Sequence, residues 1–143
     1  MDKADRLQQY LSLLRNCAGW TAEAFGKKLG VSRQTISTFE REGSHLSTMQ
    51  YLAIRKVFDD EILNNPQDTD MLAQLIEMLV DHPDKYDDKE RQEAVAKSKL
   101  MAPSIMKDPS ERKAISTAWK AILLASGIVI STAFTSYLHP KDE

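Results

Sequence analysis

The 143-residue sequence contains a single cysteine, Cys17, which excludes an intramolecular disulfide framework and a cysteine-rich metal site. Cys17 lies in an apolar helical pattern, so we expect a small buried hydrophobic residue. The histidines His45, His82 and His139 are scattered, and none lies at metal-ligand or catalytic-triad spacing from a carboxylate or a thiol. The chain also lacks a glycine-rich loop of the kind that holds phosphates. We therefore expect no enzyme activity, no metal and no cofactor.

The chain also lacks a strong charge of either sign. Lys and Arg number 19, and Asp and Glu number 21, which gives a formal net charge of −2. Nucleic-acid-binding proteins often carry a basic excess, and a DNA-binding protein of this composition would need its basic residues gathered on one face. Residues 1–10 are polar and carry four charges, unlike a secretion signal, so we expect the amino end to be cytoplasmic.

Strand patterns are missing as well. No run alternates apolar and polar residues, and no hairpin dipeptide is present, so the chain is predicted to be all-α. Leucines at helical spacing predict a first helix over residues 4–18. Thr21 and Ser32 are the predicted N-caps of two short helices that Gly30 separates. The second of these is predicted to end at Gly43, and it opens with polar residues where a helix built only for packing would be apolar.

Further helices are predicted downstream. Ser47 is expected to cap a fourth helix, with a short fifth turn at residues 61–63. The predicted inner face of the fourth helix consists of Met49, Leu52, Ala53, Val57 and Phe58. Residues 69–80 form a strongly apolar helical run, and residues 88–106 form a charged one whose last turn is broken or kinked by Pro103.

Two short helices joined at a glycine, the second opening with polar residues, make a helix-turn-helix. The residues that define the motif are Phe25 and Gly26, then Gly30-Val31-Ser32, Ile36-Ser37, Glu40 and Gly43. This spacing resembles the Cro and phage-repressor (Xre) family of DNA-binding domains over about residues 4–63. In physical terms, Gly30 permits the left-handed backbone of a tight turn, and Gly26 lets the two helices approach closely.

The resemblance implies a five-helix domain whose third helix enters the major groove of DNA. Arg33 can then bind guanine through two hydrogen bonds, and Gln34 can bind adenine in the same way. The predicted base contacts are Arg33, Gln34, Thr35 and Thr38. The predicted contacts to the DNA backbone are Arg15, Thr21, Lys27, Lys28, Ser32, Ser37, Arg41 and Ser44. The alternative is that Arg33 and Gln34 only form a solvated helix face.

The resemblance also implies a salt bridge between Arg15 and Glu40, and Arg15 is expected either to reach a phosphate as well or to have a purely structural role. The family commonly places a phosphate-clamping Gln at the second residue of helix two, where this sequence has Ala22. The remaining contacts must then supply more of the backbone binding, so a modest affinity is expected.

A single module reads only a few base pairs, so we expect a homodimer, or a higher homo-oligomer, on double-stranded DNA with half-sites about one turn apart. The resemblance places the dimer interface at the fourth and fifth helices, with Phe58, Ile62 and Leu63 as candidates. A second apolar set is too large for one helix to leave exposed. It consists of Met71, Leu72, Leu75, Ile76, Met78 and Leu79.

The carboxyl end holds one charge-free run, residues 121–138, which is predicted to be a helix that is apolar all round. Its eighteen residues would span about 27 Å, enough for a bilayer core. Trp119 and Tyr137 flank it as interfacial aromatics would. We favour a membrane anchor that tethers the protein to the cytoplasmic face, and the alternative is a buried oligomerisation helix in a fully soluble regulator.

Three segments are predicted: a DNA-binding domain at residues 1–66, a helical spacer or dimerisation region at 67–113, and a hydrophobic helix at 114–138. The predicted function is a sequence-specific transcriptional regulator, a repressor that binds operator DNA as a dimer. The alternative is a membrane-attached protein-interaction module that uses the helix-turn-helix as a scaffold. Such modules usually lose their base-contacting residues, whereas Arg33 and Gln34 are present here.

Overall fold

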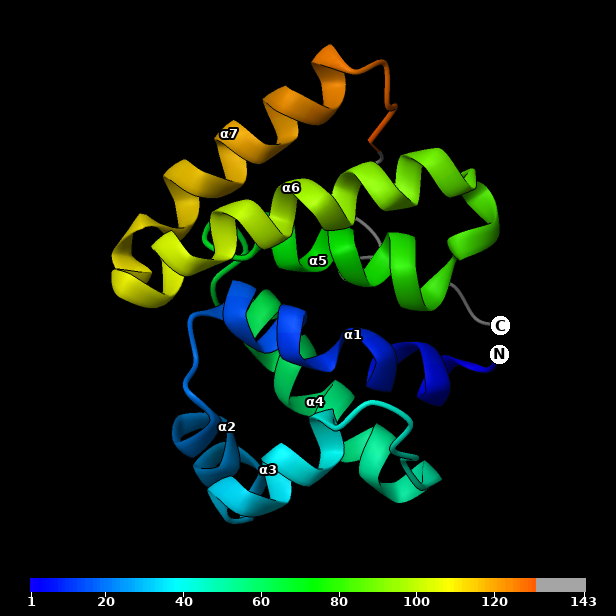
Figure 1. Cartoon of the computed structure of the whole chain (residues 1–143). Helices are drawn as coiled ribbons and strands as arrows, with labels where there is room; N and C mark the ends of the chain where they lie inside the picture. The colour runs from blue at the N-terminus through cyan, green and yellow to red at the C-terminus, as the bar shows by residue number, and fades with distance from the viewer. Residues whose placement is uncertain (131–143) are drawn as a thin grey trace.

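The computed structural model describes residues 1–130, and the secondary structure of that part is helical throughout (Figure 1). The α-helices are α1 (Lys3–Ala18), α2 (Ala22–Leu29), α3 (Arg33–Glu40), α4 (Thr48–Asn64), α5 (Asp70–Ile76), α6 (Asp88–Lys107) and α7 (Arg112–Ala125). Short turns join the later helices: the π-helical turn η1 (Glu77–Asp81) and the 3-10 turns η2 (Pro83–Lys85) and η3 (Pro109–Glu111). The all-α prediction is confirmed for the described residues.

Local capping defines the starts of α2, α3 and α4. The polar residues before α2, α3 and α4 each accept the backbone N–H three residues on, and they are Thr21 at 3.0 Å, Ser32 at 3.1 Å and Ser47 at 3.1 Å. These are the N-caps that the sequence predicts. Gly30 ends α2 with φ 76°, in the left-handed region. Helix α3 ends at Glu40, earlier than the predicted Gly43, because Ser44 Oγ donates to the carbonyl of Thr38 and turns the chain there.

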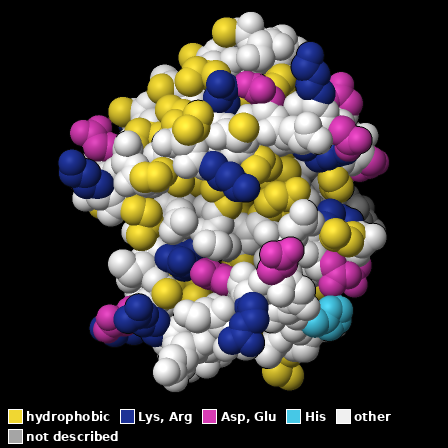
Figure 2. Space-filling model, viewed as in Figure 1, with side chains coloured by type: hydrophobic (Ala, Val, Ile, Leu, Met, Phe, Trp, Pro, Cys, Tyr) yellow, Lys and Arg dark blue, Asp and Glu magenta, His cyan; other side chains and the backbone are white. Residues whose placement is uncertain are grey.

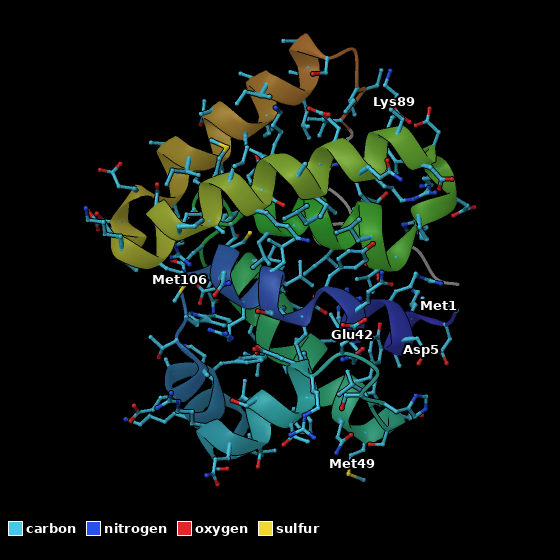
Figure 3. The ribbon with its side chains drawn as sticks, in the orientation of Figure 1. Met1, Asp5, Glu42, Met49, Lys89 and Met106 are labelled. Atoms are coloured by element: carbon cyan, nitrogen blue, oxygen red, sulfur yellow. The ribbon has the colours of Figure 1, made fainter. Side chains whose placement is uncertain are left out.

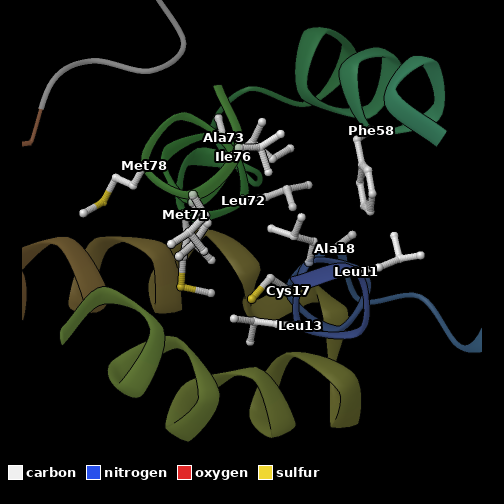
Figure 4. Packing of buried hydrophobic residues seen from close by; sticks show 14 of the residues in the cluster. Leu11, Leu13, Cys17, Ala18, Phe58, Met71, Leu72, Ala73, Ile76 and Met78 are labelled. Atoms are coloured by element: carbon white, nitrogen blue, oxygen red, sulfur yellow. The ribbon is translucent and has the colours of Figure 1, made fainter. Parts of the chain in front are cut away.

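Helix α1 lies at the centre of the molecule and is buried on more than one side. Leu7, Leu11 and Leu14 form one apolar face, and Leu13 and Cys17 form another. Figure 4 shows α1 end-on, with Phe58 of α4 on one side and the helices that follow residue 70 on the others. The expected burial of Cys17 is confirmed. One continuous hydrophobic core therefore runs from the amino-terminal helices to α7.

The inner face of α4 agrees with the predicted one at Phe58 and differs from it elsewhere. Its buried residues are Ile54, Phe58 and Ile62, whereas Met49 and Leu52 are 82% and 59% exposed. Apolar residues occur on two faces of this helix, so the sequence does not decide which face turns inward. Phe58 and Ile62 are completely buried within the chain, so both are wrong as candidates for a dimer interface. The predicted separate turn at residues 61–63 is the last turn of α4.

The apolar run at residues 69–80 forms α5 and the π-helical turn η1, and residues 71–80 are all buried. The apolar set proposed there as a second dimer candidate is thus covered by the chain itself. Helix α6 continues past Pro103 to Lys107, so the expected break does not occur. It packs against both α1 and α7.

The predicted hydrophobic helix at residues 121–138 is wrong within the described part of the chain. Helix α7 ends at Ala125 and Ser126 is its C-cap, because Gly127 takes a left-handed φ of 83° that the helix cannot continue through. Trp119, predicted at a membrane interface, is buried instead, and its Nε1 donates to the carbonyl of Ala94 at 3.3 Å. Within residues 1–130 no helix is both long and apolar enough to cross a membrane. Residues 131–138, including Tyr137, lie outside the described residues.

Candidate nucleic-acid interface

The turn between α2 and α3 is tight because Gly26 has no side chain. The N–H of Val31 donates to the carbonyl of Gly26 at 2.8 Å, which brings the turn against α2. A Cβ atom at Gly26 would lie 2.6 Å from the carbonyl oxygen of Val31, closer than real structures allow. Gly30 contributes its positive φ, and open space surrounds the position that its Cβ would take. The two glycines therefore act differently, Gly26 through close approach and Gly30 through backbone conformation.

An aromatic cluster packs the start of α2 against α4. Trp20 stacks on Phe25 at 5.7 Å and on Phe58 at 5.6 Å between ring centroids, and it is buried. Sequence reasoning missed Trp20. The signal was its position: Trp20 precedes the N-cap Thr21 and Phe25 is the fourth helical residue, the two places where a hydrophobic staple forms. The staple fixes the angle at which the chain enters α2.

The predicted salt bridge between Arg15 and Glu40 is confirmed. Arg15 Nε and Nη2 donate to the two carboxylate oxygens of Glu40 at 2.6 and 3.1 Å, and Nη1 donates to the carbonyl of Trp20 at 2.8 Å. Both side chains are only 13% exposed. This bidentate pair ties the end of α3 to α1. The phosphate contact of Arg15 stays a prediction, and it would involve a side chain that already donates to three acceptors.

A second polar clamp was not predicted. Gln8 lies buried on α1, and its Nε2 donates to the carbonyls of Phe39 at 3.0 Å and Arg41 at 2.9 Å. These carbonyls are at the carboxyl end of α3, where helical partners run out. The sequence did not predict this role for Gln8, because a polar residue next to the leucine face of a helix is ordinarily expected to be solvated. Arg15 and Gln8 together hold α3 from the side away from solvent.

The opposite side of α3 is an exposed polar row: Arg33, Gln34, Ser37, Thr38 and the following Arg41. Thr35 is only half-exposed, and its hydroxyl lies 3.0 Å from the hydroxyl of Ser32. The Thr38 hydroxyl donates back to the carbonyl of Gln34 at 3.1 Å. The structure therefore brings three of the four predicted base contacts to the surface in full and Thr35 in part.

The predicted backbone contacts on α2 flank this row. Thr21, Lys27 and Lys28 are exposed, and Lys28 Nζ lies 4.9 Å from the ring centroid of Trp20 in a cation–π contact. Lys27 is 3.8 Å from Glu23, in an exposed pair that holds it weakly. Ser32 and Ser37 are exposed, whereas Ser44 is half-buried and its hydroxyl ends α3.

The charge around the row is locally basic although the chain is not. Four cations are exposed there, Arg33, Arg41, Lys27 and Lys28, against the two exposed carboxylates of Glu23 and Glu42, and Glu40 is neutralised by its partner Arg15. Figure 2 shows fewer hydrophobic side chains in the lower part of the molecule, where α2 and α3 lie, than over α6 and α7. Within residues 1–130 no group of three or more His, Cys, Asp and Glu residues could hold a metal ion. The arrangement can therefore present hydrogen-bond donors and positive charge to an anionic polymer.

Comparison with known proteins agrees with this geometry. Residues 8–59 match the helix-turn-helix family model, and the match includes the turn, the whole of α3 and most of α4. The predicted Xre-type helix-turn-helix is thereby confirmed for this part of the chain. No curated protein and no solved structure matches the chain. A domain of this type supports a DNA-binding regulator, while the individual contacts to bases and phosphates stay predictions.

Proposed function

We propose that this chain, whose residues 8–59 form a helix-turn-helix domain, is a sequence-specific transcriptional repressor that binds operator DNA as a homodimer. Its mechanism is binding alone: a dimer that occupies a promoter excludes the polymerase. Because its target is chromosomal or phage DNA, it acts in the cytoplasm.

The exposed polar row of α3 carries this proposal. Five polar side chains are exposed along one side of α3 and just past its end, while Arg15 and Gln8 hold the helix rigidly from the opposite side. Arg33 donates two hydrogen bonds to guanine O6 and N7, and Gln34 pairs with adenine N6 and N7. Thr38 offers a methyl group to thymine, and Thr35 does so from a less exposed position.

Phosphate contacts position the helix in the groove and carry no sequence information. Lys27, Lys28 and Arg41 supply positive charge for this purpose, and hydroxyl groups supply further hydrogen bonds. These hydroxyls belong to Thr21, Ser32 and Ser37, whereas the predicted contact of Ser44 would need its hydroxyl to give up the hydrogen bond to the carbonyl of Thr38. The number of strong cations is small, so most of the affinity depends on pairing two modules on two half-sites.

The test begins with selection of bound duplexes from a random library by the full-length protein, followed by titration of selected and random duplex at fixed salt. Arg33→Ala should weaken binding to the selected duplex by about 1–3 kcal/mol and relax the preference at one base position. Lys89→Ala is the matched control, because Lys89 is exposed on α6, at the far end of the molecule from α3 (Figure 3). It should leave both titrations unchanged.

Two results would contradict the proposal in different ways. An equal loss on selected and random duplex would mean that Arg33 touches only phosphate, and the assignment of base contacts would fail. If the wild-type protein selects no duplex even at low salt, DNA binding itself fails, and the helix-turn-helix serves as a protein-binding scaffold.

A further inference from the structure

A surface groove lies between α1 and α6, away from the exposed row of α3. This α1–α6 groove is bounded by Tyr10 of α1 and by one face of α6 from Asp88 to Lys99, and its volume is about 380 Å³. Figure 2 shows hydrophobic and basic side chains together over the part of the molecule where α6 lies against α1 (Figure 1). Small-molecule sites occupy about 300–1,000 Å³, so the groove has the size for a small ligand and is narrow for a helix about 10 Å across.

The middle of the groove is apolar and well supported. Val95 and Ala96 line it from α6, and the half-buried Tyr10 lines it from α1. Tyr10 and Val95 also pack against the hydrophobic core, which fixes their positions. An aromatic ring in the groove would bury apolar surface on Val95 and Ala96 and pack against the Tyr10 ring, an arrangement that aromatic pairs favour.

The groove carries one uncompensated positive charge. Arg91 and Asp88 both line it and form an ion pair with each other. The ammonium group of Lys99 forms no ion pair or hydrogen bond with any other residue in 1–130. Lys99 follows Val95 by four residues, so the two side chains are neighbours on the surface of α6. A ligand whose ring covers Val95 can therefore place an anionic group at Lys99, and a singly charged carboxylate matches the single cation.

We propose that the α1–α6 groove binds a small aromatic carboxylate that acts as an effector of DNA binding. Its ring packs on Tyr10 and Val95, and its carboxylate pairs with Lys99. Tyr10 lies on α1 between Gln8 and Arg15, the two side chains that hold α3. A ligand that contacts both α1 and α6 therefore acts on the helix that positions α3. The effector role rests on the proposed function, whereas the binding site does not.

Calorimetric titration of the full-length protein with 2-naphthoate and with its neutral analogue 2-naphthamide tests the site. The wild type should bind 2-naphthoate more tightly. Lys99→Met should weaken 2-naphthoate about tenfold or more and leave 2-naphthamide unchanged, because it removes the charge and keeps an apolar stem. Lys107→Met is the matched control, since Lys107 is exposed on α6 outside the groove. A wild type that does not bind 2-naphthoate, or an equal loss of both probes in Lys99→Met, overturns the proposal.

Filling the groove separates this site from binding to exposed apolar residues elsewhere, such as Leu100, which is 74% exposed. Ala96 is exposed, so Ala96→Trp should leave the circular-dichroism melt unchanged while its side chain occupies the groove and abolishes binding of both probes. Ser104→Trp is the control, because Ser104 is exposed on the same helix outside the groove, and it should bind both probes as the wild type does. Binding of 2-naphthoate that persists in Ala96→Trp overturns the proposal.

The effector role is tested in the duplex titration. Saturating 2-naphthoate should change the affinity of the full-length protein for the selected duplex at least about fivefold, and the duplex should change the affinity for 2-naphthoate by the same factor. Ala96→Trp should bind the duplex without this response. Duplex binding that ignores bound 2-naphthoate overturns the effector role. If 2-naphthoate binds in the groove but no duplex is selected, the proposed function fails and the binding site stands.

Discussion

The region of α1–α4 and the region of α5–α7 are stabilised by different kinds of interaction. In α3 only Ile36 is fully buried, and the short helix is held by a cap at its start and by polar clamps from α1. In residues 71–80 every side chain is buried, and the segment is held by packing. Helix α3 is therefore thinly packed itself, and its rigidity comes from its contacts with α1.

The two regions meet on α1, and removing the second region tests how far the first depends on it. Deletion of residues 67–143 exposes Leu13 and Cys17, which lie on the side of α1 that packs against α6 (Figure 4). We expect the free energy of unfolding to fall by more than about 3 kcal/mol, since each buried leucine contributes about 1.5–3 kcal/mol. Urea unfolding followed by circular dichroism measures it. The domain boundary at residue 66 stays a prediction. It would be supported if the fragment had the same free energy of unfolding as the full chain.

Within the first region, substitutions at Gly26 and Gly30 distinguish the cost of a steric clash from the cost of a strained backbone conformation. Gly26→Ala should destabilise the protein by about 3 kcal/mol, because its Cβ meets a backbone carbonyl at 2.6 Å that cannot move aside. Gly30→Ala should cost only about 1 kcal/mol, the strain of a positive φ in open space. Thermal and urea unfolding of the two variants side by side measures the difference. Equal losses would mean that α2 and the turn are not packed as described.

Arg112 links the two regions by polar contacts. Its Nη1 donates to the carbonyl of Ala18 at 3.1 Å and to Glu61 at 3.0 Å, and its Nη2 lies 3.6 Å from Asp68. Arg112→Met should destabilise the chain by about 2 kcal/mol, below the value for a fully buried pair, because Glu61 and Asp68 keep some contact with water. The neighbouring exposed Lys113 is the control. If Lys113→Met costs as much, the loss reflects net charge and not the link.

Cys17 lies on α1, which both regions share. Ionisation of its thiol at high pH should have the smallest effect on stability of the changes considered. Burial raises the pKa of the Cys17 thiol to about 12, from an ordinary value of 9.0. The folded state therefore favours the neutral thiol, and the associated stability is complete below about pH 9 and lost as the pH rises toward 12. At pH 8 iodoacetamide should label the unfolded chain and leave the native one unmodified, as mass spectrometry would show. Rapid native labelling would mean that the shared core opens readily.

The helix-turn-helix is more predictable than the rest of the fold because its signals are local. Thr21, Ser32 and Gly30 act on backbone groups a few residues away, so their residue types are enough to place α2, the turn and α3. The exposed side of α3 follows from Ile36 facing inward. The pairing of Arg15 with Glu40 joins residues distant in the sequence, and only the family resemblance implied it.

The predictions that are wrong concern features of the fold that depend on residues distant in the sequence. The inner face of α4 is predicted correctly only at Phe58, since two faces of the helix carry apolar residues and the core buries the one that also holds Ile54 and Ile62. The carboxyl-terminal run was assigned to one long helix, because its hydrophobicity fits a lipid environment and a protein core equally well. Trp119 could be placed only once α6 and Ala94 were in position to accept its N–H.

The sequence by itself determined the helical class, the caps and the motif of α2 and α3, because these depend on interactions within a few residues along the chain. The tertiary structure alone decided which face of α4 is buried, where α7 ends, and that α1 is shared by both regions. Burial is a property of the whole assembly of helices: an apolar side chain lowers the free energy equally well against any surface that excludes water. Only the folded chain specifies which surface that is.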